Sequence, residues 1–97
     1  MQIIVTGRHV ELTEPIEQYA IKRCDHLEKF RDHVQSIEIV LDKVHLDFEV
    51  EVKIEVAHHP TIVGKSSQED LYAGIDQAID KVVRQLHDWK EKIQSHK

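Results

Sequence analysis

Residues 47–56, with the sequence DFEVEVKIEV, alternate strictly between polar and apolar side chains. Because successive side chains of a β-strand point to opposite faces of the sheet, this pattern predicts a strand with one wholly apolar face. The opposite face carries Glu49, Glu51, Lys53 and Glu55, which only water or a basic partner would accommodate. The chain is therefore expected to form a sheet that is covered on one face and open on the other.

Three further segments read as strands. Residues 36–42 place Ile37, Ile39 and Leu41 on one face, and the short KVHLD stretch that follows suits a hairpin although it lacks an Asn-Gly turn. Residues 2–7 are rich in β-branched side chains and form a first strand. Residues 61–66 form a fourth strand, in which Gly64 indicates a bulge or a close backbone approach.

Two helices complete the pattern. Thr13 is a good N-cap and Pro15 suits a first helical turn, so a helix is expected from there to about Phe30. A capping box, either Ser66 with Glu69 or Ser67 with Asp70, should open a second helix of about 27 residues and roughly 40 Å. A rod of that length outruns the sheet, so its last turns should project. Its apolar stripe consists of Leu71, Ile75, Ala78, Ile79, Val82, Leu86, Trp89 and Ile93.

The element order is therefore β-α-β-β-β-α. The economical packing is an α+β fold in which two helices lie side by side on one face of a four-stranded sheet. A chain of 97 residues forms one domain, residues 1–97. The composition, 40% hydrophobic and 32% charged, is that of a globular protein.

Neither a membrane span nor a signal peptide is evident, so a cytoplasmic protein without membrane contact is expected. The single cysteine, Cys24, falls within a helical pattern and reads as a small buried residue. Eight histidines occur without the spacing of a metal site, and no motif of a nucleophile, a phosphate loop or a catalytic triad is present. No enzyme, metal, cofactor or small-molecule substrate is expected.

The net charge of −5 is unevenly distributed. Residues 68–80 hold four anions and no cation, whereas residues 81–97 hold five cations and two anions, a net of +3. A local field of this kind can attract a polyanion although the whole chain is acidic. The simpler interpretation is a solvated helix face whose cations complement the helix dipole.

The candidate RNA-binding residues lie on both helices. At 100° per residue, the last helix should present its cations on one solvent-facing side, flanked by two more basic residues, and the first helix should add a second set to the same patch. Tyr72 is the best exposed candidate for stacking on a base. The ten residues are Lys22, Arg23, His26, Lys29, Lys81, Arg84, Gln85, His87, Lys90 and Lys92.

Several stretches carry a resemblance: IVTG at residues 4–7, LTE at 12–14, Leu27-Glu28 with Phe30, and DLYAGIDQAIDKVVRQL at 70–86. Together they resemble the ribosome hibernation promoting factors, also called ribosome-associated inhibitors. The resemblance implies a non-enzymatic protein that binds the small (30S) ribosomal subunit where messenger RNA and the A- and P-site tRNAs lie, and that blocks translation in stationary phase or stress.

The resemblance also implies which residues contact 16S ribosomal RNA. Matched positions are Arg23, His26, Lys81, Arg84, Gln85, Lys90 and Lys92. Three departures stand out: Asp88 and Trp89 where the family often has basic residues, and Gly74 in place of a usual alanine. The chain resembles a short form that lacks the C-terminal dimerisation domain of long members, and a separate factor would then pair ribosomes.

Two alternatives remain open. A protein-interaction adaptor of the sigma-factor modulation type could use the acidic sheet face around Glu49, Glu51 and Glu55. A double-stranded RNA-binding domain is less favoured, because its element order differs and SSQED stands where its basic loop is expected.

Overall fold

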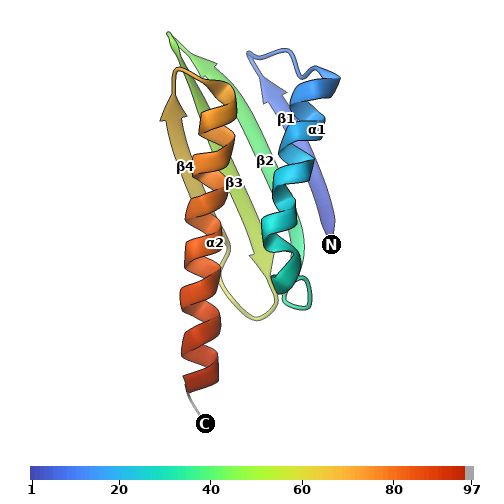
Figure 1. The fold of residues 1–97 in the computed structure, drawn as a ribbon, viewed down its shortest axis with the longest axis vertical. Coiled ribbons are helices and arrows are strands. Elements are labelled where there is room, and N and C mark those ends of the chain that lie inside the picture. Colours follow the sequence, from blue (N-terminus) through green and yellow to red (C-terminus); the bar gives the residue numbers. More distant parts are fainter. Residues whose placement is uncertain (96–97) are drawn as a thin grey trace.

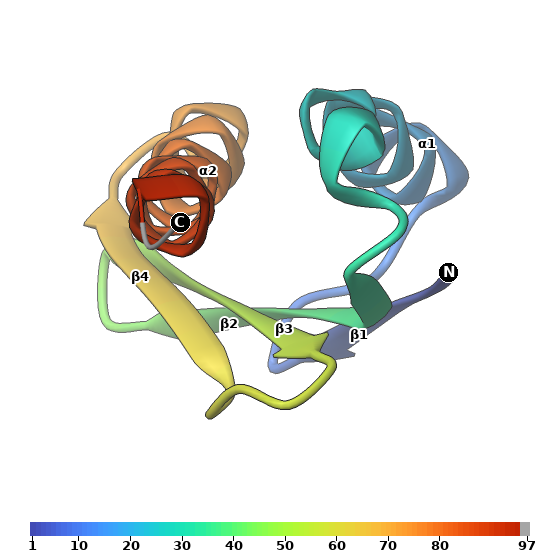
Figure 2. The ribbon, with the colours of Figure 1, turned by 90° about the horizontal axis from the view of Figure 1, so that it is seen from below.

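The computed structural model describes residues 1–95 and contains one mixed sheet with its helices on a single face (Figures 1 and 2). The strand order is β1-β2-β3-β4, with β1 parallel to β2 and the other neighbours antiparallel. The predicted α+β fold and the order β-α-β-β-β-α are confirmed. The elements are β1 (Gln2–Arg8), α1 (Glu14–Arg23), the 3-10 helix η1 (Cys24–Phe30), β2 (Val34–Val44), β3 (Asp47–Val56), β4 (Ile62–Gln68) and α2 (Leu71–Ser95).

The alternation in β3 produces the expected division of the sheet. Val50, Val52 and Ile54 are almost completely buried, and Val52 lies between Ile39 of β2 and Gly64 of β4 in the register. The charged residues between them face the side that carries no helix. Hydrophobic burial between this one face and the helices therefore supplies the core.

The first helix differs from the prediction. Thr13 caps α1, since its Oγ accepts from the Ile16 N–H at 3.5 Å, but the α-helix ends at Arg23 and the chain continues as η1. The buried residues of η1 are Cys24, Leu27 and Phe30, three apart. With 3.0 residues per turn, a 3-10 helix keeps such residues in one row against the core, whereas an α-helix would rotate each by about 60° relative to the last. The prediction of a continuous α-helix to Phe30 is therefore wrong.

The start of α2 also differs from the prediction. Ser66 and Ser67 belong to β4, and the buried Ser66 hydroxyl donates to the Gly74 carbonyl at 2.7 Å. The side chain of Asp70 instead accepts from the Tyr72 N–H at 3.0 Å and caps the helix. Neither predicted capping box forms, because the fourth strand extends through Gln68 and leaves no loop for it.

Two glycines mark the contact between α2 and the sheet. A Cβ on Gly64 would lie 2.6 Å from the Ala78 carbonyl oxygen, so this glycine marks a close approach of helix and strand. Of the two alternatives predicted for Gly64, a bulge or a close backbone approach, the structure has the close approach. Gly74 is buried beside Val50 and Ser66. The departure at Gly74 is therefore a buried packing position of the helix.

The long helix α2 extends past the lower end of the sheet, as expected (Figure 1). Its residues from Leu71 to Leu86 line the core, whereas Ile93, in the projecting part, is 50% exposed. Among the described residues, no helix is both long and apolar enough to cross a membrane.

Candidate nucleic-acid interface

The two helical segments run in the same direction across the sheet. Strands β1, β2 and β4 are parallel in sense, and the chain returns through α1 and η1 after β1 and enters α2 after β4 (Figure 1). Their C-terminal halves therefore lie at the same end of the molecule. Since the C-terminal end of a helix carries partial negative charge, cations are favoured at that end on both segments.

The 3-10 geometry sorts the side chains of η1 into rows. Residues three apart eclipse one another, so Arg23, His26 and Lys29 fall in one row beside the buried row. The acidic residues fall in the third row, where Glu28 Oε1 pairs with Arg31 Nη1 at 2.8 Å. An α-helix would not have aligned the cations in this way.

The cations of this row meet those of α2. Lys29 Nζ lies 2.7 Å from His87 Nε2, and the His87 ring meets the Phe30 ring edge to face at 5.3 Å between centroids. Lys90 Nζ lies 5.7 Å from the Phe30 centroid. Because an ammonium group can only donate, Lys29 is the donor in this contact. We call the cations Arg23, Lys29 and Lys90, together with the imidazole side chains of His26 and His87, the interhelix cation cluster.

Arg23 is anchored at the upper end of this cluster. Its Nε lies 2.8 Å from Asp76 Oδ1 of α2, in an ion pair without hydrogen-bond geometry. The Tyr19 hydroxyl donates to both carboxylate oxygens of Asp76, at 2.8 and 2.9 Å. This hydrogen bond raises the pKa of Tyr19. The three side chains connect α1 to α2, and neither Tyr19 nor Asp76 was predicted as part of a site.

The remaining predicted residues lie elsewhere, which corrects the expectation of one stripe. Lys81 Nζ donates to the Lys65 carbonyl at 2.5 Å, and Gln85 Nε2 donates to the Val63 carbonyl at 2.8 Å, so both lie on the β4 side of α2. Lys92 borders a hollow on that same side, whereas Lys22 and Arg84 are exposed to solvent. Helical periodicity gave the angle of each side chain but not the neighbour on each flank.

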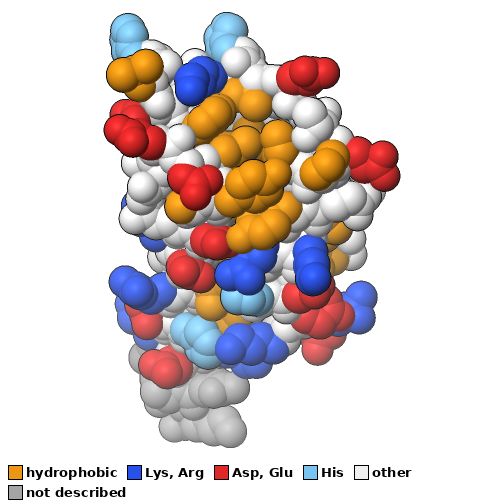
Figure 3. Space-filling view, turned by 45° about the horizontal axis from the view of Figure 1, so that its top comes forward, with side chains coloured by type: hydrophobic (Ala, Val, Ile, Leu, Met, Phe, Trp, Pro, Cys, Tyr) orange, Lys and Arg blue, Asp and Glu red, His pale blue; other side chains and the backbone are white. Residues whose placement is uncertain are grey.

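Aromatic and apolar side chains lie above the cation cluster, between α1 and α2, and we call this region the interhelix surface. Tyr19 and Tyr72 meet edge to face, with centroids 4.8 Å apart, and Ile16 and Val83 pack partly buried against the core. Figure 3 shows hydrophobic side chains gathered on this face, with basic side chains below them. The site thus changes from aromatic to cationic along its length.

The family departures Asp88 and Trp89 point away from the cluster. Trp89 meets His33 and His59 edge to face, at 5.0 and 5.5 Å, at the lower end of the sheet. Asp88 lines the hollow of about 290 Å³ that it shares with Trp89 and Lys92. Asp88 is therefore on the β4 side of α2 and does not lie between the helices.

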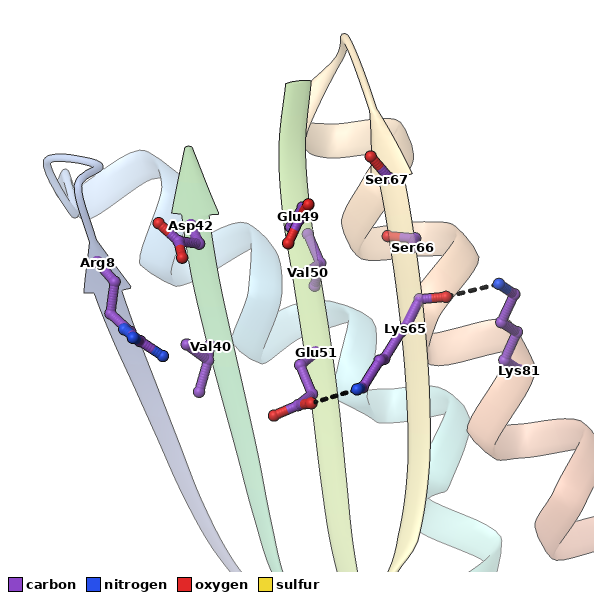
Figure 4. Close-up of a pocket in the computed structure, with 10 residues that line it drawn as sticks. All are labelled: Arg8, Val40, Asp42, Glu49, Val50, Glu51, Lys65, Ser66, Ser67 and Lys81. Carbon is purple, nitrogen blue, oxygen red and sulfur yellow. Dashed lines mark hydrogen bonds and ion pairs between the residues drawn. The ribbon is translucent and has the colours of Figure 1, made fainter. Parts of the chain in front are cut away.

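The open sheet face is less acidic than its sequence indicated. Lys53 Nζ lies 3.4 Å from Glu51 and 3.9 Å from Glu38, and Lys65 Nζ lies 3.4 Å from Glu51. Figure 4 shows the shallow hollow of about 460 Å³ on this side, with cationic and anionic side chains interspersed. Glu49 and Glu55 are exposed and have no ion pair within residues 1–95.

The single cysteine of the chain, Cys24, is buried in the core. Burial raises the pKa of the Cys24 thiol to about 11, which suits the predicted inert cysteine and not a nucleophile. Across the part of the chain that the structure describes, no three His, Cys, Asp or Glu side chains gather as a metal site would require. The interhelix cation cluster is the arrangement with the clearest chemistry, since it suits an anionic ligand.

Two relatives of this chain share the name ribosome hibernation promoting factor. The ribosome hibernation promoting factor of Pseudomonas putida is 33% identical over 95 residues, covering 98% of this chain and 92% of that protein. The factor of the same name from Escherichia coli K12 is 30% identical over 96 residues, covering 99% of this chain and all of the relative.

Solved structures share the fold. A ribosomal subunit interface protein from Coxiella burnetii superposes with a TM-score of 0.86 at 23% identity, covering 94% of this chain and 99% of that one. The N-terminal domain of Thermus thermophilus Protein Y superposes with a TM-score of 0.83 at 26% identity, covering 92% and 99%. The family model described as sigma 54 modulation protein / S30EA ribosomal protein matches residues 3–94, and the chain belongs to that family.

Proposed function

We propose that this protein is a ribosome hibernation factor that binds the small ribosomal subunit through 16S ribosomal RNA. The observation that carries the proposal is the interhelix cation cluster, in which Lys29, His87 and Lys90 gather around Phe30 between η1 and α2. Its relatives in Pseudomonas putida and Escherichia coli carry the name of ribosome hibernation promoting factor, which supports the same role.

The role follows from electrostatics and shape. Phosphate groups of RNA release counterions when cations neutralise them, so a local cluster supplies binding free energy even in a chain of net charge −5. Binding in the messenger RNA channel at the A and P sites would exclude tRNA and stop translation during stationary phase or stress. The protein would act in the cytoplasm without catalysis, as a single ribosome-binding unit, and paired ribosomes would require a separate factor.

The test exchanges the charge of two cluster residues. We expect Lys29→Glu with Lys90→Glu to abolish co-sedimentation with isolated small subunits, because each substitution places a carboxylate where a phosphate must lie. In the milder Lys29→Gln/Lys90→Gln variant, the slope of log K against log salt should fall by about 0.7 to 0.9 for each lost contact. Binding is measured by sedimentation and by fluorescence anisotropy across a salt series.

The matched control is Lys43→Glu with Lys65→Glu, which changes the net charge by the same amount. These two lysines belong to β2 and β4 and lie outside the interhelix cation cluster. This control should retain binding. Equal loss in both double variants would contradict a localised site. Lys81→Glu is not used, because Lys81 also donates to the Lys65 carbonyl on β4, so its replacement would change more than a contact with RNA.

A second candidate is a protein-interaction adaptor. The exposed carboxylates of Glu49 and Glu55 on β3 favour it, together with the sigma 54 modulation wording of the family description. Glu49→Lys with Glu55→Lys should leave subunit binding intact if RNA is the partner of the helices. Loss of a protein partner with unchanged subunit binding would favour the adaptor.

A further inference from the structure

The upper part of the interhelix surface carries a partly exposed tyrosine. Tyr72, in the first turn of α2, is 40% exposed, and its ring meets Tyr19 at an interplanar angle of 87°. In an edge-to-face pair, one ring presents its edge to the face of the other. Tyr19 can therefore cover at most one face of Tyr72, and the exposed part of the residue offers aromatic surface to a base.

The carboxylates next to this ring are already engaged. Asp70 accepts the Tyr72 N–H at 3.0 Å, and Asp76 accepts the Tyr19 hydroxyl and pairs with Arg23 at 2.8 Å. The charge of Asp76 is balanced by Arg23. An anionic chain can therefore approach Tyr72 without meeting an uncompensated carboxylate at Asp76.

Arg23 lies between the tyrosines of the interhelix surface and the lower residues of the cation cluster. Its Nε is buried against Asp76, while one third of its side chain remains exposed. A guanidinium carries five N–H donors in a planar fork, so four remain on its terminal nitrogens for a phosphate. Below it, the row continues through His26 to Lys29.

We propose that the interhelix surface between α1 and α2 binds an unpaired RNA nucleotide, whose base stacks on Tyr72 and whose phosphate contacts Arg23. This inference rests on the proposed function and specifies how RNA is held. The ligand must be unpaired, because the bases of a duplex are stacked on one another and offer no free face. Aromatic platforms beside a basic groove hold single-stranded RNA in this way, with tolerance for base identity.

The experiment compares Tyr72→Leu with Tyr72→Phe. Binding is measured to isolated small subunits and to a short fluorescein-labelled single-stranded RNA, across a salt series. Tyr72→Leu preserves apolar packing and removes the ring, so affinity should fall about 5- to 150-fold while the salt slope stays unchanged. Tyr72→Phe should bind within about twofold of the unaltered protein, since stacking does not need the hydroxyl. Leu46→Ala is the control, because Leu46 is a turn residue that is 82% exposed and lies outside the interhelix surface.

A second measurement uses the unaltered protein. NMR signals of the Tyr72 ring protons should move upfield when the RNA oligonucleotide is added, because a stacked base shields them. Unmoved ring signals, or unchanged affinity of a folded Tyr72→Leu variant, would overturn the inference. If Tyr72→Leu instead loses self-association or the binding of a Lys/Arg-rich peptide while RNA binding stays intact, the interhelix surface binds a protein. That result would also overturn the inference.

Failure of the inference differs from failure of the proposed function. If the protein binds subunits in a salt-dependent manner that Lys29 and Lys90 control, but Tyr72→Leu binds equally well, only the stacking is refuted. If the unaltered protein binds neither subunits nor RNA, the proposed function itself is refuted.

Discussion

Among the residues of the interhelix surface, Asp76 connects the largest number of neighbours. Both of its carboxylate oxygens lie within hydrogen-bonding distance of the Tyr19 hydroxyl, and Oδ1 also pairs with Arg23. One carboxylate therefore joins α1 to α2 and orients a cation. The sequence does not identify this role, because Asp76 stands out there only as one of the four anions of residues 68–80. Its partners lie 57 and 53 positions away, and no local pattern reports such a contact.

The Tyr19–Asp76 hydrogen bond predicts a change at alkaline pH. Asp76→Asn should bring the pKa of Tyr19 back toward its ordinary value near 10, because the carboxylate that disfavours the phenolate is removed. A pKa that is raised in the folded state stabilises the fold below pH 10, and this contribution is lost as pH rises through the folded value. Ultraviolet difference titration of tyrosinate checks the shift. An unchanged titration of Tyr19 in Asp76→Asn would contradict the assigned cause.

The contact between α2 and β4 decides the packing at the scale of elements. Gly64 lies where the helix crosses the strand, and a Cβ there would lie 2.6 Å from the Ala78 carbonyl oxygen and 2.8 Å from Val82 Cγ1. Backbone cannot yield as a flexible side chain does. The glycine therefore sets how closely the helix approaches the sheet.

Gly64→Ala should consequently destabilise the protein by roughly 1–3 kcal/mol, through overpacking. Urea denaturation followed by circular dichroism gives the free energy of unfolding. Val63→Ala is the neighbouring control on the open face, where a loss below about 1 kcal/mol is expected. Equal losses in the two variants would mean that the close approach has no energetic role.

Periodicity predicted the elements well where a single period persisted. The alternation of residues 47–56 gave β3 with its bounds and its buried face, and the spacing in α2 gave its core residues. It failed where periods mix, since Cys24, Leu27 and Phe30 fit a spacing of three and were read as part of an α-helix. Likewise, within residues 1–95 the non-glycine residues with positive φ are His9, His45 and His58, at turns and bends, a signal that turn rules centred on glycine and asparagine do not use.

The charge distribution matters most at the scale of the whole molecule. The chain has a net charge of −5, yet the C-terminal halves of both helical segments place cations at one end. The sequence locates the ten predicted RNA-binding residues but not their neighbours in space. The parallel direction of the two helical segments in the structure brings five of those ten together in the interhelix cation cluster. Lys81 and Gln85 instead turn toward β4.

Association kinetics should therefore respond to the local field. We expect the association rate constant with small subunits to fall as salt increases, because screening weakens attraction to the cluster. If the net charge governed the encounter, salt would screen repulsion between two anions and the rate would rise. Stopped-flow fluorescence across an ionic-strength series distinguishes the two signs.

The two side chains that α2 extends to β4 have a consequence for life at high concentration. A sheet rim normally offers a free row of carbonyl oxygens onto which a stray strand from another molecule can zip. Lys81 and Gln85 fill two of those positions from within the same chain. Because these two carbonyls are already hydrogen-bonded within the chain, we expect this part of the β4 edge to resist pairing with a strand of another copy at high protein concentration.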